Sequence, residues 1–483
     1  MGMRYYSLDV AKGLGILLMI LSHPFLGSLS SVDSLFFLNV AEGIPKIVWY
    51  CIFVPLGVIG NMGSFFVFLS AICNTLSFLD ISKKGWKVVW RYLMMKCVFG
   101  ILLRAIECFW VSWSTDYDIV ETRTLQLPVV PIPFSSNVID CIGFNSWSIS
   151  LVVYLLRLIP FLRDYRIQIY LLYILSIVLT IFSRWISEGC LVITDWCKTQ
   201  HFTILEYCFS KMSSGTDQIP QLWPFGLLGA SVAIILHSGV SLLHLIWFSS
   251  IVFCVNCIIG MVYLYSIDDF VTELFEAFKP EGFEFISMGV EAVLILVLIL
   301  LIDDKRRLAL RRRGSLKRTS YLRKLSVLSF TIFILQKWFN KHMLVIFEFF
   351  FGQLIDSEKK ELLWTWPVIV LFMVVLAFAA IGITELWKHF EFRCSMEHQV
   401  NRILLWLFDK QYSKTDYKAI IYGPLKEVQN EIDCGHRDEE PVEVELGMQR
   451  LDSFCVCYKQ ATKLNGYQSN KTNSSRRARF SGL

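Results

Sequence analysis

The ionisable side chains with the most distinctive spacing lie near the N-terminus of the chain. Asp9 and Lys12 are three positions apart, which is one turn of a helix, so their side chains can pair on one face. An apolar stretch follows and ends at His23-Pro24. His23 follows Asp9 by 14 residues, which is about 21 Å along an α-helix. The spacing predicts a membrane helix with charged residues, Arg4 among them, at one face of the bilayer and an imidazole near the other.

His23 has two interpretations that the residues alone leave open. An ionisable side chain inside a membrane is a functional candidate, because burying it there is costly unless it has a task. An imidazole can also lie at the membrane interface as a structural group that hydrogen-bonds a neighbouring helix.

The remaining histidines and cysteines give weaker signals. His237 and His244 are seven positions apart, but a predicted turn separates them and no carboxylate lies beside them, so we expect no metal site. His201 is interpreted as a solvated loop residue. The 14 cysteines are scattered, mostly within apolar windows, and do not indicate a disulfide framework.

The elements that must hold these residues are membrane helices. Hydrophobic residues make up 55% of the 483 residues and charged residues 18%, whereas soluble domains carry roughly a quarter charged residues. The mean hydropathy is +0.52. Long uncharged windows predict an all-α, polytopic transmembrane bundle of about ten spans. The predicted spans are 8–26, 46–78, 92–113, 138–160, 167–187, 222–238, 242–266, 285–302, 325–351 and 366–387.

The loop charges alternate along the chain. The loops after the second, fourth and eighth spans are basic, and those after the third and seventh are acidic or mixed. Because basic loops remain in the cytoplasm, this pattern predicts that both termini are cytoplasmic. The richest basic loop is 305–324, which includes Arg311, Arg312 and Arg313. Anionic lipid suffices as its partner.

The C-terminal part of the chain differs in composition. We divide the sequence into a membrane domain, 1–402, and a cytoplasmic tail, 403–483, that is largely disordered. An amphipathic stretch within 392–409 is expected to lie along the membrane surface. The segment beyond about residue 411 is expected to be removable without loss of the fold, because it offers little apolar surface to bury.

The opening segment, Arg4-x-x-Ser7-Leu8-Asp9-x-x-Lys12-Gly13 followed by His23, resembles the start of membrane acyltransferases. These belong to the acyltransferase-3 clan, which includes proteins similar to the catalytic domain of heparan-α-glucosaminide N-acetyltransferase. Five later segments also resemble the family, although less specifically. They are 65–71, 140–143, 220–230, 325–336 and 387–397.

The resemblance implies transfer of an acyl group, acetyl in the simplest case, from a cytoplasmic coenzyme A thioester to a glycan or lipid-linked sugar. His23 would be the general base or the nucleophile. Arg4, Asp9, Lys12 and Gln336 would support it. No permanently bound cofactor and no nucleic-acid partner are expected.

A thioester donor would give the basic loop a second use. Arg311, Arg312 and Arg313 would dock the donor's phosphates, since guanidinium groups suit phosphate oxygens.

Three departures from the family's pattern bear on activity. Lys12 stands where the family has arginine, Gln336 where it has a late histidine, and Cys394-Ser395 where it has Gly-Pro. Gln336 can hydrogen-bond but cannot exchange a proton near neutral pH. Two alternatives stay open: a transporter or flippase without covalent chemistry, which kinked helices with proline and glycine would suit, and a family member that has lost catalysis, which these departures would explain.

Overall fold

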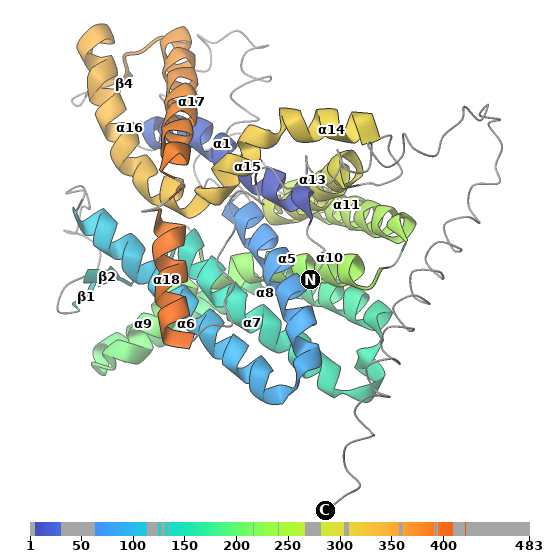
Figure 1. Cartoon of the computed structure of the whole chain (residues 1–483). Coiled ribbons are helices and arrows are strands. Elements are labelled where there is room, and N and C mark those ends of the chain that lie inside the picture. Colours follow the sequence, from blue (N-terminus) through green and yellow to red (C-terminus); the bar gives the residue numbers. More distant parts are fainter. Residues whose placement is uncertain are drawn as a thin grey trace, which may run out of the picture. The chain divides into compact units, whose positions relative to one another are not determined.

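The computed structural model describes a chain that is predominantly helical (Figure 1). The described residues are 5–29, 63–113, 124–126, 131–134, 136–215, 217–239, 241–265, 282–303, 309–356, 361–390, 392, 395–408 and 421. The chain divides into two compact units, Met1–Gln429 and Asn430–Leu483, and every described residue belongs to the first.

The helices of this unit are long, and its strands are short. The long helices are α1 (Tyr6–Leu29), α5 (Gly63–Ile81), α6 (Trp86–Trp113), α7 (Val138–Leu158), α8 (Tyr165–Thr199), α10 (Ile219–His237), α11 (Leu242–Tyr265), α13 (Phe283–Ile302), α16 (Ser329–Phe351) and α17 (Trp366–His389). Shorter helices are η2 (Ser82–Lys84), η3 (Pro160–Arg163), α9 (Thr203–Ser213), α14 (Ala309–Arg318), α15 (Ser320–Val327) and α18 (Met396–Phe408). Two antiparallel pairs, β1 (Thr124–Gln126) with β2 (Pro131–Pro133) and β3 (Ile355–Asp356) with β4 (Glu361–Leu362), complete the elements.

Within the described residues, seven helices are long and apolar enough to cross a membrane. They are α5, α7, α8, α10, α11, α13 and α17. The chain is thus a multi-pass membrane protein by the length and composition of its helices. Each of the ten spans expected from the sequence overlaps a long helix, and α1, α6 and α16 account for the other three. A total of ten membrane crossings remains a prediction.

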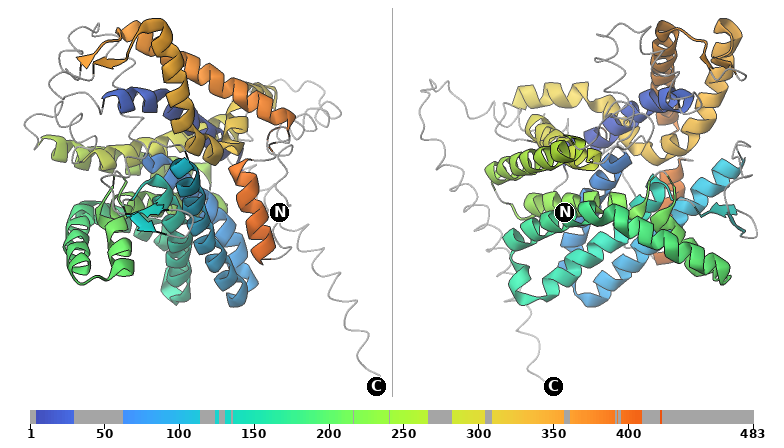
Figure 2. Two further views of the ribbon diagram at one scale, coloured as in Figure 1. Left: turned by 90° about the vertical axis from the view of Figure 1, so that its left-hand side faces the viewer. Right: turned by 180° about the vertical axis from the view of Figure 1, so that it is seen from behind.

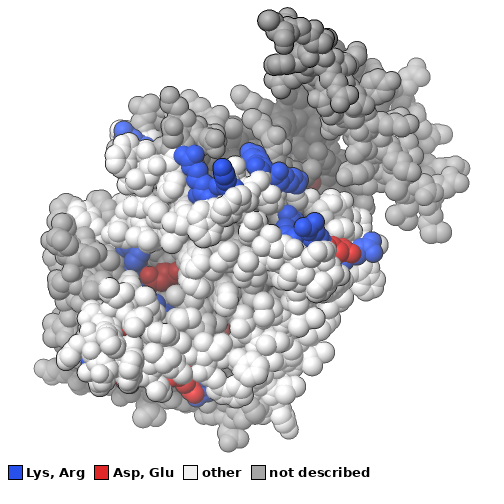
Figure 3. Space-filling view, turned by 90° about the horizontal axis from the view of Figure 1, so that it is seen from below, with Lys and Arg blue, Asp and Glu red and all other residues white. Residues whose placement is uncertain are grey.

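Helix α8 shows how these helices divide their faces. Its buried face carries hydroxyl side chains, including Ser176, Thr180 and Ser187, whereas Trp185 and Val192 on its outer face are 63% and 71% exposed. This polarity is the reverse of that of a soluble helix and suits a lipid-facing exterior with close packing of small residues inside. Figure 3 shows one face of the molecule on which most of the described surface is uncharged.

The first helix, α1, is held at its N-terminal end by backbone contacts with neighbouring elements. A Cβ atom added at Gly13 would lie 1.8 Å from the carbonyl oxygen of Leu322 in α15, so the two helices touch through their backbones. Asp303 accepts hydrogen bonds from the backbone N–H groups of Tyr6 (3.1 Å) and Ser7 (3.0 Å), the first two residues of α1. Burial raises the pKa of Asp303, and these hydrogen bonds oppose the rise. Figures 1 and 2 show α1 next to α15, α16 and α17.

Helix α18 corresponds to the amphipathic stretch of the sequence. Met396, Val400 and Leu404 recur every fourth residue and are buried, whereas Trp406 is 82% exposed. The Arg91 guanidinium donates to the carbonyl oxygen of Phe408 (2.6 Å), which ties the end of α18 to α6. The buried stripe therefore packs against the helices of the bundle, and α18 extends past residue 402, where we divided the sequence.

One residue beyond α18 takes part in the packing. Ile421 is 1% exposed and contacts Val327, Leu328 and Phe392. Its carbonyl oxygen accepts a hydrogen bond from the fully buried Arg323 (3.0 Å). Burial lowers the pKa of Arg323, and the nearby Asp9 opposes that effect. This contact is an argument against removing the segment beyond about residue 411, and its removal without loss of the fold stays a prediction.

We predict that a chain ended at Gln429 folds as the full chain does, and that a chain ended at Tyr412 is less stable. The shorter chain lacks Ile421, so Arg323 loses a buried acceptor worth about 1.5–3 kcal/mol. Thermal unfolding of both proteins in the same detergent measures the difference. Equal midpoints would show that the Ile421 contact contributes nothing to stability.

Candidate functional site

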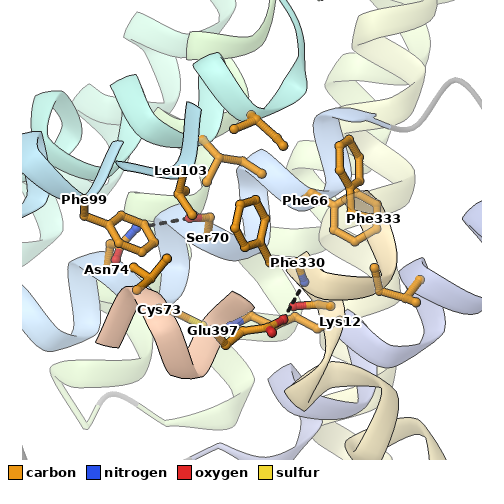
Figure 4. Close-up of a pocket in the computed structure, with 15 residues that line it drawn as sticks. Lys12, Phe66, Ser70, Cys73, Asn74, Phe99, Leu103, Phe330, Phe333 and Glu397 are labelled. Atoms are coloured by element: carbon orange, nitrogen blue, oxygen red, sulfur yellow. Dashed lines mark hydrogen bonds between the residues drawn. The ribbon is translucent and has the colours of Figure 1, made fainter. Parts of the chain in front are cut away.

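The candidate site is a partly open cavity of about 280 Å³ lined by residues of six helices (Figure 4). Lys12 and Ile16 of α1 line one side, and the other sides come from α5, α6, α7, α16 and α18. Its walls are mainly aromatic and aliphatic, with a few polar side chains. The lining residues are Lys12, Ile16, Phe66, Ser70, Cys73, Asn74, Phe99, Leu103, Ile139, Ile142, Ser329, Phe330, Phe333, Glu397 and Val400.

Glu397 closes the cavity where α18 meets α16. Its carboxylate accepts hydrogen bonds from the backbone N–H groups of Phe330 (2.6 Å) and Thr331 (3.2 Å) and from the Thr331 hydroxyl. Met396 N–H in turn donates to that hydroxyl (2.8 Å). Burial raises the pKa of Glu397, and these hydrogen bonds oppose the rise. A carboxylate at the first turn of α16 satisfies N–H groups that have no partner within the helix.

A chain of hydrogen bonds reaches the cavity from α6. The Lys96 ammonium donates to Oδ1 of Asn74 (2.6 Å), and Nδ2 of Asn74 donates to the Ser70 hydroxyl (3.1 Å). The rings of Tyr92 and Phe99 each lie 5.4 Å from the ammonium. Asn74 and Ser70 line the cavity, and Lys96 lies behind them. Each donor in this chain is directed toward the cavity.

The turn of α1 that contains His23 lies beyond the Ile16 end of the cavity. The carbonyl oxygen of Met19 accepts hydrogen bonds from the amide of Gln336 (3.1 Å) and from the Ser22 hydroxyl (3.3 Å). Pro24 lacks the N–H that would bond the carbonyl of Ile20, so the helix is weakened in the turn that follows Met19. Side-chain donors from a neighbouring helix are a common way to support a proline within a membrane helix. Gln336 thus holds the turn that presents His23.

The structure places the residues singled out in the sequence as follows. Asp9 lies near enough to Arg323 for their charges to interact, and Lys12 lines the cavity. Gln336 is buried against α1. His23 belongs to α1, and its side chain lies outside the described part of the structure, as does Arg4.

The basic loop forms helix α14. Arg313 in this helix is exposed, as are Lys317 and Arg318. The side chains of Arg311 and Arg312 lie outside the described part of the structure. Helix α14 contacts α15, which packs on the Gly13 face of α1. Because Gly13 follows Lys12 by one residue, about 100° around the helix, the cavity and the basic helix lie on different faces of α1.

A second polar cluster was not predicted from the sequence. Arg104 contacts Glu107 (2.6 Å) and Asp140 (3.4 Å), and Lys211 contacts Asp140 (3.0 Å). The four side chains are at most 10% exposed. The Asn137 amide donates to Glu107 (2.7 Å), and Asn137 and Asp140 together cap α7. The capping pattern at 137–140 was the available signal. Two cations and two anions balance one another, so this cluster joins α6, α7 and α9 as a structural network.

Among the described residues, no group of three or more His, Cys, Asp or Glu side chains is arranged to hold a metal ion. The aromatic cavity and its few polar groups instead suit an organic ligand.

The chain matches no model of a protein family, no curated protein and no solved structure in the comparisons made.

We predict that Gln336→Leu lowers the free energy of unfolding by about 0.5–1.5 kcal/mol, the usual contribution of a hydrogen bond. It also speeds hydrogen exchange of the backbone amides near Met19, because the support at this turn is lost. Thermal unfolding and hydrogen exchange measure the two effects. Val345→Leu, at an exposed position of α16, is the matched control. Unchanged exchange in Gln336→Leu would contradict a supporting role.

Proposed function

We propose that this chain is a multi-pass membrane acyltransferase. It transfers an acyl group, acetyl in the simplest case, from a cytoplasmic coenzyme A thioester to a hydroxyl or amino group of a glycan or lipid-linked sugar. The proposal includes ten membrane spans with both termini in the cytoplasm.

The observation that carries the proposal is the convergence of separate segments on one cavity. Five of the six segments that resemble the acyltransferase family line it. Lys12 comes from the opening segment, Ser70 from 65–71, Ile142 from 140–143, Phe333 from 325–336 and Glu397 from 387–397. A site shared by these segments requires that they meet in space, and the cavity is where they do.

Two contacts support the proposal further. The bond from Thr331 to Glu397 joins two of these segments directly. Gln336, at the end of one of them, contacts Met19, which lies in the opening segment one turn before His23. The His23 turn therefore lies about one helical turn beyond the cavity along α1 and α16.

The proposed reaction uses the His23 imidazole as the general base. The imidazole takes a proton from the acceptor's hydroxyl or amino group as the acceptor's oxygen or nitrogen attacks the thioester carbonyl. The bond between carbon and sulfur then breaks, and the thiolate of coenzyme A leaves and receives the proton from the imidazolium. Asp9 and Lys12 organise the end of α1 nearest the donor, and Gln336 holds the His23 turn in place.

We predict that His23→Ala and His23→Gln lower acyl transfer by about 10²–10⁴-fold, the usual contribution of a general base. Thermal stability should change little. The measurement is thioester consumption by the purified protein, with and without sugar acceptors. His342→Gln is the control, because His342 is an exposed histidine of α16 that hydrogen-bonds its own helix at Trp338. Wild-type turnover in both His23 variants would assign His23 a structural role.

No thioester consumption by the wild-type protein under any condition would contradict the proposed function itself. That result would favour a transporter or a chain without catalysis.

We predict that changing Arg311, Arg312 and Arg313 together to Gln raises the apparent KM for the thioester and makes it less sensitive to salt. The exposed guanidinium of Arg313 is suited to bind phosphate oxygens. The KM for the acceptor should stay unchanged. Arg163 and Arg166, which are also exposed, form the control pair when changed to Gln. Equal changes in both KM values would indicate an effect on lipid contact or insertion instead.

We predict that a reporter fused after residue 410 behaves as cytoplasmic and that one inserted near Glu276 behaves as external. The alternation of basic and acidic loops is the reason. Protease or alkylation access in sealed vesicles measures both positions. The opposite result at either position would contradict the ten-span topology.

A further inference from the structure

We propose that Glu291 of α13 is a proton-binding site inside the bundle, where a proton on Oε2 keeps the carboxyl neutral beside the Ser64 hydroxyl of α5. The proposal depends on the described helices and on no part of the proposed function. Glu291 is the ninth of the 20 residues of α13, the most apolar of the seven described candidate spans. It is the only ionisable residue between Phe285 and Ile302. Ionisable side chains at such positions commonly bind protons or ions, because burying them there without a task is costly.

The surroundings of Glu291 offer one polar partner. Glu291 is 0% exposed, and Ser64 is 4% exposed. The Ser64 hydroxyl donates to Oε1 of Glu291 (2.7 Å), whereas Oε2 is buried and has no hydrogen-bond partner among the described residues. Helix α13 packs against α1, α5, α8, α10, α11 and α14. In the described parts of these helices, no charged or titratable side chain acts on Glu291 and no backbone N–H group donates to it.

Asp140 shows what a buried carboxyl needs in order to stay charged. Its side chain is 10% exposed, and its two oxygens contact two cations, Arg104 (3.4 Å) and Lys211 (3.0 Å). Among the described residues, no cation lies beside Glu291. A charge without a partner is costly in a low-dielectric interior. A proton on Oε2 removes that charge and leaves Oε1 as a carbonyl oxygen that still accepts from Ser64.

A proton suits this site better than a metal ion does. A metal ion needs several oxygen or nitrogen ligands at once. Within the described part of the chain, Glu291 has the Ser64 hydroxyl beside it and belongs to no group of three metal-binding side chains. Loss of the proton would leave a charge beside the first turn of α5, and water would have to reach the carboxyl to stabilise it. Release of the proton is therefore coupled to separation of α13 from α5.

Infrared spectroscopy of the purified full-length chain tests the proposal, because a protonated carboxyl has a carbonyl stretching band above the amide bands. The protein is measured at neutral pH in a detergent without ester or acid groups. We expect the wild-type spectrum to contain a band that is lost in Glu291→Gln and that shifts after transfer of the wild-type protein to D₂O. Equal spectra of the two proteins in this region would overturn the proposal. A band that is lost in the variant but never moves in D₂O would overturn release of the proton.

Asp217→Asn is the matched control, because it removes a half-buried carboxyl at the same turn of α5. A Cβ atom added at Gly63, which precedes Ser64, would lie 3.2 Å from Oδ1 of Asp217. The band assigned to Glu291 should remain in this variant. Its loss in Asp217→Asn but not in Glu291→Gln would place the proton on Asp217 and overturn the proposal.

Ser64→Ala tests the hydrogen bond and decides the proposal even if Glu291→Gln fails to accumulate as folded protein. The band should remain but move to higher wavenumber, because the carbonyl oxygen loses its hydrogen bond. Ser77→Ala should leave the band unchanged, because Ser77 lies on the same helix, is exposed and donates to its own backbone at Cys73 (2.9 Å). A band at the wild-type position in Ser64→Ala, or no such band in either protein, would overturn the proton-binding site.

Discussion

Backbone groups at buried helix ends need hydrogen-bond partners from the protein itself, because water does not reach them. The first N–H groups of a helix have no acceptor within that helix. In this chain, Asp303 supplies the acceptors for α1, and Glu397 supplies them for α16. Asp303 follows α13 and caps α1, whereas Glu397 belongs to α18 and caps α16. The caps therefore satisfy the unpaired backbone N–H groups of α1 and α16. They also fix these helices relative to the elements that supply the carboxylates. The cavity depends on this arrangement, because Lys12 and Phe330 lie close to the two capped turns.

Much of the helical organisation could be predicted from the sequence, and the partners within it could not. Apolar windows indicate where helices occur, because the length of a span and its lack of charge are local properties. The contact of Arg104 with Asp140 joins positions 36 residues apart and has no local signature. The periodicity of α18 shows an apolar face, but a face that meets lipid and one that meets protein have the same spacing. Ile421 lies in a segment of soluble composition, where a single buried side chain leaves no periodic pattern.

The candidate site shows the same division. Lys12 could be selected from its spacing to Asp9, and Gln336 only through the resemblance to the acyltransferase family, where it stands at the position of a late histidine. Ser70, Asn74 and Lys96 could not. A lysine near a basic loop is expected wherever a membrane helix begins in the cytoplasm. Its importance comes from the hydrogen bonds that connect it to Ser70, and these exist only when α5 and α6 are packed together.

Two faces of α1 have different neighbours. At Gly13 its backbone touches α15, which leaves no room for a ligand on that face. Helix α14 continues into α15, so exposed basic side chains lie beside the face that is closed by contact. Lys12 and Ile16 turn a different face of α1 to the cavity. On the proposed function, a donor bound by its phosphates at α14 would therefore lie outside the cavity. Both faces belong to α1, which contains the His23 turn, and Gln336 of α16 contacts that turn at Met19 while other residues of α16 line the cavity. On the proposed function, this hydrogen bond fixes the position of the His23 turn relative to the wall of the cavity.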